Sequence, residues 1–99
     1  MAANRTQETQ EPVKREVVIQ NQYGIHARPA ALLTKIASRY DADCYIEKGG
    51  NKVSGKSIMG LMTLEASKGS KLIITAEGED ADEMLDEIES LIERKFDED

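Results

Sequence analysis

A histidine and an arginine lie close together in Gly24–Ala30, which reads GIHARPA. At the start of a helix, His26 would lie beside free backbone N–H groups and the positive end of the helix dipole, which favour an anion and a neutral imidazole. Arg28 adds a planar donor group that suits phosphate oxygens. These residues could accept and release a phosphoryl group. Taken alone, they also fit a plain helix cap at His26 beside a solvated Arg28.

A second chemical stretch, Gly50–Ser57, reads GNKVSGKS and matches the pattern of a nucleotide-binding phosphate loop. Such a loop belongs to a parallel sheet in which each strand–helix–strand unit takes about 30 residues. The chain has 99 residues, and Val53 and Ser54 continue the alternation of a strand that returns from a turn at Gly49–Asn51. We therefore expect a hairpin and a helix start here, and no nucleotide hydrolysis.

Apolar periodicity predicts the elements that must position these residues. The last helix has a capping-box-like start at Asp80 and Glu83. The expected strands are Arg15–Gln20, Ala42–Lys48, Lys52–Ser54 and Lys71–Glu77, and the expected helices are Ala27–Tyr40, a short one from Ile58, and one after Asp80. The order β-α-β-β-α-β-α predicts an α+β domain with its helices on one face of a mostly antiparallel sheet.

Length and composition indicate one domain. Residues 1–13 are polar and without periodicity, so we expect a disordered extension before a domain that spans residues 14–99. No apolar run suggests a membrane span or a secretory signal, and a cytoplasmic location is expected. Because Cys44 is the only cysteine and His26 the only histidine, an internal disulfide and a multi-histidine metal site are excluded. Cys44 is expected to be a packed strand residue.

Charge is divided unevenly along the chain. Residues 77–99 carry twelve acidic and two basic side chains, whereas residues 1–76 carry seven acidic and eleven basic ones. The acidic end disfavours nucleic acid. The mildly basic body suits an acidic partner protein or a phosphoryl group, and we interpret the acidic end as a solvated helix face.

The two motifs together are similar to those of one family. GIHARPA, followed about thirty residues later by GKSIMGLM, resembles the HPr family of histidine phosphocarrier proteins, and the resemblance runs from about Lys14 to Phe96. It implies that family's open-faced β-sandwich, a four-stranded mostly antiparallel sheet with three helices on one face. It also implies a role in the bacterial phosphoenolpyruvate-dependent phosphotransferase system. The resemblance leaves open whether the chain serves the sugar or the nitrogen-related branch.

The resemblance assigns a role to each matching residue. His26 resembles the histidine that is phosphorylated at Nδ1 by phosphorylated Enzyme I and then donates to an Enzyme IIA domain. Arg28 resembles the arginine that steadies the phosphohistidine, and Pro29 matches the proline that starts the helix. Tyr23 departs from the small or polar turn residue of many members.

Ser57 matches the serine that an HPr kinase/phosphorylase phosphorylates in some branches of the family. At the start of a helix, an added phosphate is favoured by the helix dipole, and Ser57 also fits a plain N-cap. The expected partner-binding surface consists of Ala27, Pro29, Ile58, Met59 and Met62.

The resemblance implies a carrier and not a turnover enzyme, with no cofactor or metal. The implied partners are Enzyme I, Enzyme IIA domains, an HPr kinase/phosphorylase and a transcriptional regulator, with no nucleic acid or membrane, and a monomer is expected. The alternative is a purely regulatory interaction protein controlled by phosphorylation of Ser57.

Overall fold

The computed structural model describes residues 11–98, in which four strands and three helices follow the expected order. A 3-10 turn, η1, is added after the last helix. The elements are β1 (Val13–Val18), α2 (Ala27–Ala37), β2 (Asp43–Lys48), β3 (Asn51–Ser54), α3 (Ile58–Thr63), β4 (Lys71–Glu77), α4 (Ala81–Glu93) and η1 (Lys95–Asp97).

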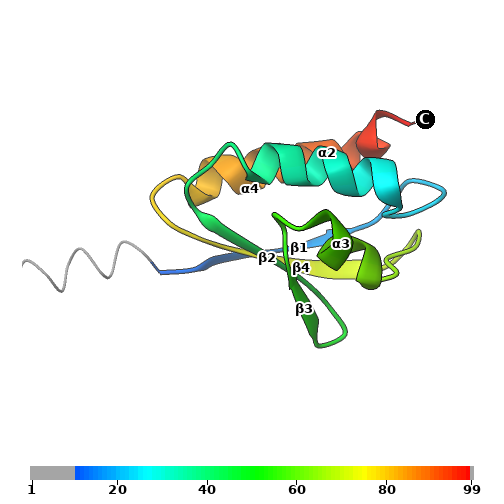
Figure 1. Ribbon diagram of the computed structural model, residues 1–99, viewed down its shortest axis with the longest axis horizontal. Helices are drawn as coiled ribbons and strands as arrows, with labels where there is room; N and C mark the ends of the chain where they lie inside the picture. Colours follow the sequence, from blue (N-terminus) through cyan, green and yellow to red (C-terminus); the bar gives the residue numbers. More distant parts are fainter. Residues whose placement is uncertain (1–10, 99) are drawn as a thin grey trace, which may run out of the picture.

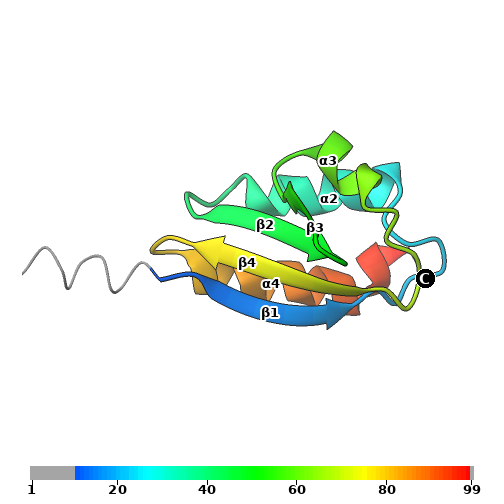
Figure 2. The same cartoon turned by 90° about the horizontal axis from the view of Figure 1, so that it is seen from below.

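The four strands form one sheet in the order β1-β4-β2-β3. Every pair is antiparallel, with Val17 opposite Leu72 and Ile46 opposite Ile74. Helices α2 and α4 lie side by side over one face (Figure 1), and the other face is open when the molecule is seen from below (Figure 2). The predicted α+β fold with an open-faced sheet is confirmed. The parallel unit that a nucleotide-binding fold requires is absent from residues 11–98.

The core lies between the sheet and the helices. Along β4, Leu72, Ile74 and Ala76 are buried whereas Lys71, Ile73 and Glu77 are exposed, because successive strand residues point to opposite faces. The helices contribute the predicted apolar stripes. Their buried residues are Pro29, Ala30, Leu33, Ile36 and Ala37 of α2 and Ala81, Met84, Leu85, Ile88, Leu91 and Ile92 of α4.

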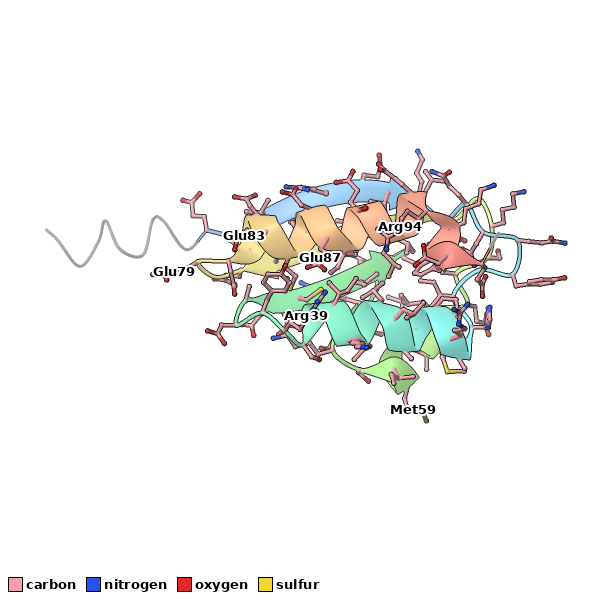
Figure 3. All side chains as sticks on the ribbon, turned by 90° about the horizontal axis from the view of Figure 1, so that it is seen from above. Arg39, Met59, Glu79, Glu83, Glu87 and Arg94 are labelled. Carbon is pink, nitrogen blue, oxygen red and sulfur yellow. The ribbon has the colours of Figure 1, made fainter. Side chains whose placement is uncertain are left out.

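Two polar clusters hold α4 in place. Arg15 on β1 pairs with Asp86 at 2.6 Å and with Glu89 at 3.0 Å. Between the two long helices, Glu87 accepts hydrogen bonds from Tyr40 and Arg39, and Figure 3 shows Arg39 and Glu87 facing each other across the gap. The hydrogen bond from Tyr40 lowers the pKa of Glu87. These contacts fix α4 against the edge of the sheet and against the segment that follows α2.

Several details differ from expectation: β1 spans Val13–Val18 and not Arg15–Gln20, and α2 ends at Ala37 and not at Tyr40. The first ten residues of the expected extension, 1–13, lie outside the described residues, and Val13 already pairs with Ala76 in β1. The predicted capping box of the last helix is wrong, because the Asp80 side chain makes no cap hydrogen bond. Its two oxygens instead accept from the backbone N–H groups of Asp41 and Ala42, at 3.0 and 2.9 Å.

The described part of the chain has no helix long and apolar enough to cross a membrane.

Candidate functional site

His26 lies at the boundary where α2 begins. Its backbone is extended, with φ −99° and ψ −164°, and its carbonyl oxygen accepts the helical hydrogen bond from Ala30 N–H at 3.0 Å. The imidazole makes no capping hydrogen bond. Because the first N–H groups of a helix lack intrahelical partners, those of Ala27 and Arg28 present partial positive charge next to the ring. The imidazole is therefore beside an anion-favouring helix end without being used to close it.

The loop before His26 is pinned by a close backbone approach. Gly24 has φ +68°, and a Cβ at this position would lie 2.2 Å from the carbonyl oxygen of Ala66. That same carbonyl accepts the N–H of Ile25 at 2.9 Å. Only glycine allows both the left-handed conformation and this contact, so Gly24 sets the place of the histidine.

The end of the chain returns to the histidine. Glu98 Oε2 lies 2.8 Å from His26 Nε2, and Glu98 Oε1 accepts from Asn21 Nδ2 at 3.0 Å. Asn21 is fully buried and also donates to the carbonyl of Gly24 at 2.8 Å. His26, the loop before it and Glu98 thus form one hydrogen-bonded group.

A hollow of about 320 Å³ opens at this place. His26 and Arg28 line it from the start of α2, Tyr23 from the loop, and Asp97 and Glu98 from the chain end. The His26 side chain is 43% exposed, and the Tyr23 ring meets it edge-on with 6.5 Å between centroids. The predicted pair of His26 and Arg28 therefore faces one surface depression, accessible to a partner protein.

Ser57 starts α3, as expected. Its Oγ accepts from Gly60 N–H at 2.9 Å, so the plain N-cap interpretation is confirmed. Lys56 Nζ donates to the carbonyl of Tyr40 at 2.9 Å, close to the end of α2. Lys56 therefore binds a backbone carbonyl of the protein itself. The stretch GNKVSGKS consists of a turn, strand β3 and the start of α3.

The expected partner surface is apolar and mostly exposed. Ile58 is 41% exposed, Met59 77% and Met62 42%, and Ala27 is exposed at the start of α2. Helix α3 packs beside α2 (Figures 1 and 2), and Met59 lies at the outer edge of the molecule (Figure 3). Pro29 is buried, so its contribution is to the start of the helix and not to the surface itself.

Other polar groups lie outside the hollow at His26. A second hollow, of about 520 Å³, lies between the segment after α2 and the start of α4, with Glu79, Asp80 and Glu83 in its lining. Glu79 and Glu83 lie at the opposite end of α4 from Arg94 (Figure 3). Within residues 11–98, no group of three or more histidine, cysteine or acidic residues is arranged to hold a metal ion. Cys44 is buried on β2, and burial raises the pKa of its thiol to about 11.

Glu98 and Asn21 were missed by sequence reasoning, which interpreted the acidic end as a solvated helix face. His26 and Glu98 are 72 residues apart, so their contact produces no local pattern in the sequence. One signal was available: Phe96 is an isolated aromatic residue in the charged segment ERKFDED, and it is fully buried. Such an anchor indicates that the segment folds back onto the domain.

Comparison with known proteins gives consistent results. Residues 13–94 match the family described as "PTS HPr component phosphorylation site". The phosphocarrier protein HPr of Borreliella burgdorferi is 47% identical over 82% of this chain and 94% of its own length. The HPr-like protein Crh of Bacillus subtilis is 40% identical over 84% and 98%. The phosphocarrier protein NPr of Shewanella violacea is 42% identical over 87% and 94%.

A solved structure shows the same fold. The crystal structure of HPr-C-His from Thermoanaerobacter tengcongensis superposes with a TM-score of 0.85 at 41% identity, covering 88% of this chain and 98% of that one. The family match and the superposed structure therefore cover most of the described residues.

Proposed function

The chain belongs to the HPr family of phosphotransferase-system phosphocarriers, and on that premise we propose that His26 carries the phosphoryl group. Nδ1 of His26 attacks the phosphorus held by phosphorylated Enzyme I. The new N–P bond forms as the bond to the donor atom on Enzyme I breaks, and an Enzyme IIA domain later removes the group by the reverse chemistry. His26 is consumed and regenerated, so the protein is a carrier and not a turnover catalyst.

The observation that carries this proposal is the exposed imidazole at the start of α2. A phosphoryl group on Nδ1 would meet the N–H groups of the helix end and the guanidinium of Arg28, which lines the same hollow. The apolar side chains of Ile58, Met59 and Met62 on the adjacent helix offer partners a surface that can adapt its shape.

We further propose that Ser57 is a regulatory phosphorylation site. Phosphate on its Oγ would keep an acceptor for Gly60 N–H and would add negative charge at the positive end of α3. The charge would lie directly before Ile58 and Met59 and so alter the same docking surface. A purely regulatory protein controlled by Ser57 is the second candidate, favoured by this proximity.

Labelled phosphoenolpyruvate and Enzyme I separate the two candidates. A carrier gains an acid-labile label that passes to an Enzyme IIA domain, disappears in His26→Ala and persists in Ser57→Ala. A pure regulator gains no label from Enzyme I but gains acid-stable label at Ser57 from an HPr kinase and ATP. That second pattern would overturn the carrier proposal.

A further inference from the structure

We infer that Glu98 is a positioning residue for phosphoryl transfer: its carboxylate holds the proton of His26 on Nε2 and thereby leaves the lone pair on Nδ1. The inference rests on the proposed function of His26 and deepens it. It concerns the end of the chain, which the sequence alone connected with no role.

The first step is the identity of the proton donor. Glu98 Oε2 and His26 Nε2 are 2.8 Å apart, a hydrogen-bond distance. An ionised carboxylate has no proton to donate, so the hydrogen must be on Nε2. In a neutral imidazole only one ring nitrogen carries hydrogen, and the hydrogen bond made by one nitrogen decides the state of the other. Nδ1 is then the nucleophilic atom, on the side of the ring away from Glu98.

The second step is that Glu98 is held in place. Its side chain is 15% exposed, and its other oxygen accepts from Asn21 Nδ2 at 3.0 Å. Asn21 is fully buried, and its amide nitrogen also donates to the carbonyl of Gly24. Since both partners of that nitrogen are acceptors, the amide must present its nitrogen to them, although its buried Oδ1 has no hydrogen-bond partner among the described residues. A buried amide thus links the carboxylate to the loop that carries His26.

The third step is how the chain reaches this place. Lys95, Phe96 and Asp97 all have positive φ, between +55° and +60°, a conformation that non-glycine residues adopt only when surrounding contacts impose it. Phe96 is fully buried as part of the hydrophobic core, and its burial supplies such a contact. The turn ends with the Glu98 side chain at the ring, and strained segments of this kind cluster at functional sites.

The last step is the charge balance during transfer. As the Nδ1 lone pair forms the bond to phosphorus, the ring becomes an imidazolium that still carries its Nε2 hydrogen. Glu98 faces that positive charge and stabilises it, as the aspartate of a hydrolase triad stabilises its histidine. In the return step the N–P bond breaks, its electron pair returns to Nδ1, and the neutral ring keeps the Nε2 hydrogen. No other reactant is needed.

The alternative is that the carboxylate merely fastens the chain end. If the carboxylate only holds the chain end in place, the isosteric substitution Glu98→Gln should change stability but leave the His26 tautomer and the rate of phosphoryl transfer unaltered. If Glu98 positions the proton of His26, the same substitution should weaken the bond to Nε2–H and slow phosphoryl transfer, because a neutral amide accepts a weaker hydrogen bond than a carboxylate.

The first test is nitrogen NMR of the unphosphorylated protein with ¹⁵N-labelled His26. We expect a single tautomer with hydrogen on Nε2 and a slowly exchanging Nε2–H signal in the wild type. In Glu98→Gln that signal should exchange faster, and in Glu98→Ala the ring should become a mixture of tautomers. Glu93→Gln, which removes an exposed carboxylate of the same segment, should match the wild type. A wild-type ring with hydrogen on Nδ1, or spectra that Glu98→Ala leaves unchanged, would overturn the inference.

The second test is the rate of phosphoryl transfer from saturating phosphorylated Enzyme I. We expect about a tenfold fall in the maximal rate for Glu98→Gln and a larger fall for Glu98→Ala, the size expected on losing a hydrogen bond to a charged group. Glu93→Gln should stay within about twofold of the wild type. Equal maximal rates in all three variants would refute the positioning role. If the wild type gains no phosphoryl group at all, the proposed function fails, whereas the NMR result still decides whether Glu98 holds the Nε2 proton.

Discussion

Replacing Gly24 by alanine tests whether the loop before His26 is set by one backbone contact. The new methyl group would lie 2.2 Å from the carbonyl oxygen of Ala66 and 2.8 Å from Cα of Ser67. Both are backbone atoms, so no side-chain rotation relieves the overlap. The loop must move away, and the hydrogen bond from Ile25 N–H to the Ala66 carbonyl must lengthen or break.

Two contributions set the size of the effect. An L-residue at positive φ costs about 1–2 kcal/mol, and overpacking against backbone costs about 1–3 kcal/mol, so Gly24→Ala should lower the free energy of unfolding by about 2–5 kcal/mol. Gly49 is the matched control: its φ is +55°, and a Cβ added there would have no neighbouring atom within 4 Å. Gly49→Ala should lose only the conformational part, about 1–2 kcal/mol.

Urea unfolding of both variants measures the difference. With a typical dependence of about 1–3 kcal/mol per molar urea, Gly24→Ala should unfold at a clearly lower urea concentration than Gly49→Ala, with an unchanged slope. Phosphoryl transfer from Enzyme I should also fall in Gly24→Ala, because His26 is displaced, and remain normal in Gly49→Ala. Equal midpoints and equal transfer rates in the two variants would refute the reasoning.

Four further predictions concern single groups. Arg28→Ala should slow transfer from Enzyme I about tenfold or more, since a charge-assisted hydrogen bond to the phosphoryl group is lost; an unchanged single-turnover rate would contradict this. Ser57→Ala should lower the free energy of unfolding by about 1 kcal/mol in urea, because the cap to α3 is lost, while the acid-labile label is kept. Cys44, whose buried thiol has a pKa of about 11, should react with a disulfide reagent at pH 8 about a hundredfold more slowly than in denaturant; equal rates would show that β2 opens readily. The backbone N–H groups of Asp41 and Ala42 lower the pKa of Asp80, so the ionised carboxylate stabilises the folded protein above about pH 4, and this stabilisation is lost as the pH falls further. In Asp80→Asn the free energy of unfolding, measured with urea or by heating, should therefore fall less steeply at acid pH. A pH profile equal to that of the wild type would contradict this.

The sequence predicted the elements with strong periodicity and missed what depends on distant contacts. The alternation in Lys71–Glu77 and the helical stripe from Ala30 to Ala37 follow from which face is buried, and both are confirmed. The capping box at Asp80 failed because two backbone N–H groups from the turn before β2 occupy its carboxylate. No local rule anticipates a partner 39 residues away.

The residues of the site were likewise predicted where local patterns decide and missed where distant contacts do. GIHARPA and GKSIMGLM placed His26 and Ser57 at helix starts, because capping and turn residues act locally. The role of Glu98 was not predicted, because its contact with His26 joins residues 72 apart in the chain and depends on the burial of Phe96. The charge pattern predicted a solvated helix face for the acidic end, whereas the Glu98 carboxylate lies against the histidine.

Phosphorus–nitrogen NMR of the phosphorylated protein tests the central claim most directly. The protein, labelled with ¹⁵N at His26, is phosphorylated with phosphoenolpyruvate and catalytic Enzyme I, and the coupling between phosphorus and each ring nitrogen is measured. The account predicts one-bond coupling to Nδ1 of His26, with hydrogen retained on Nε2 opposite Glu98. Attachment to Nε2, or a phosphoryl group on any residue other than His26, would contradict it.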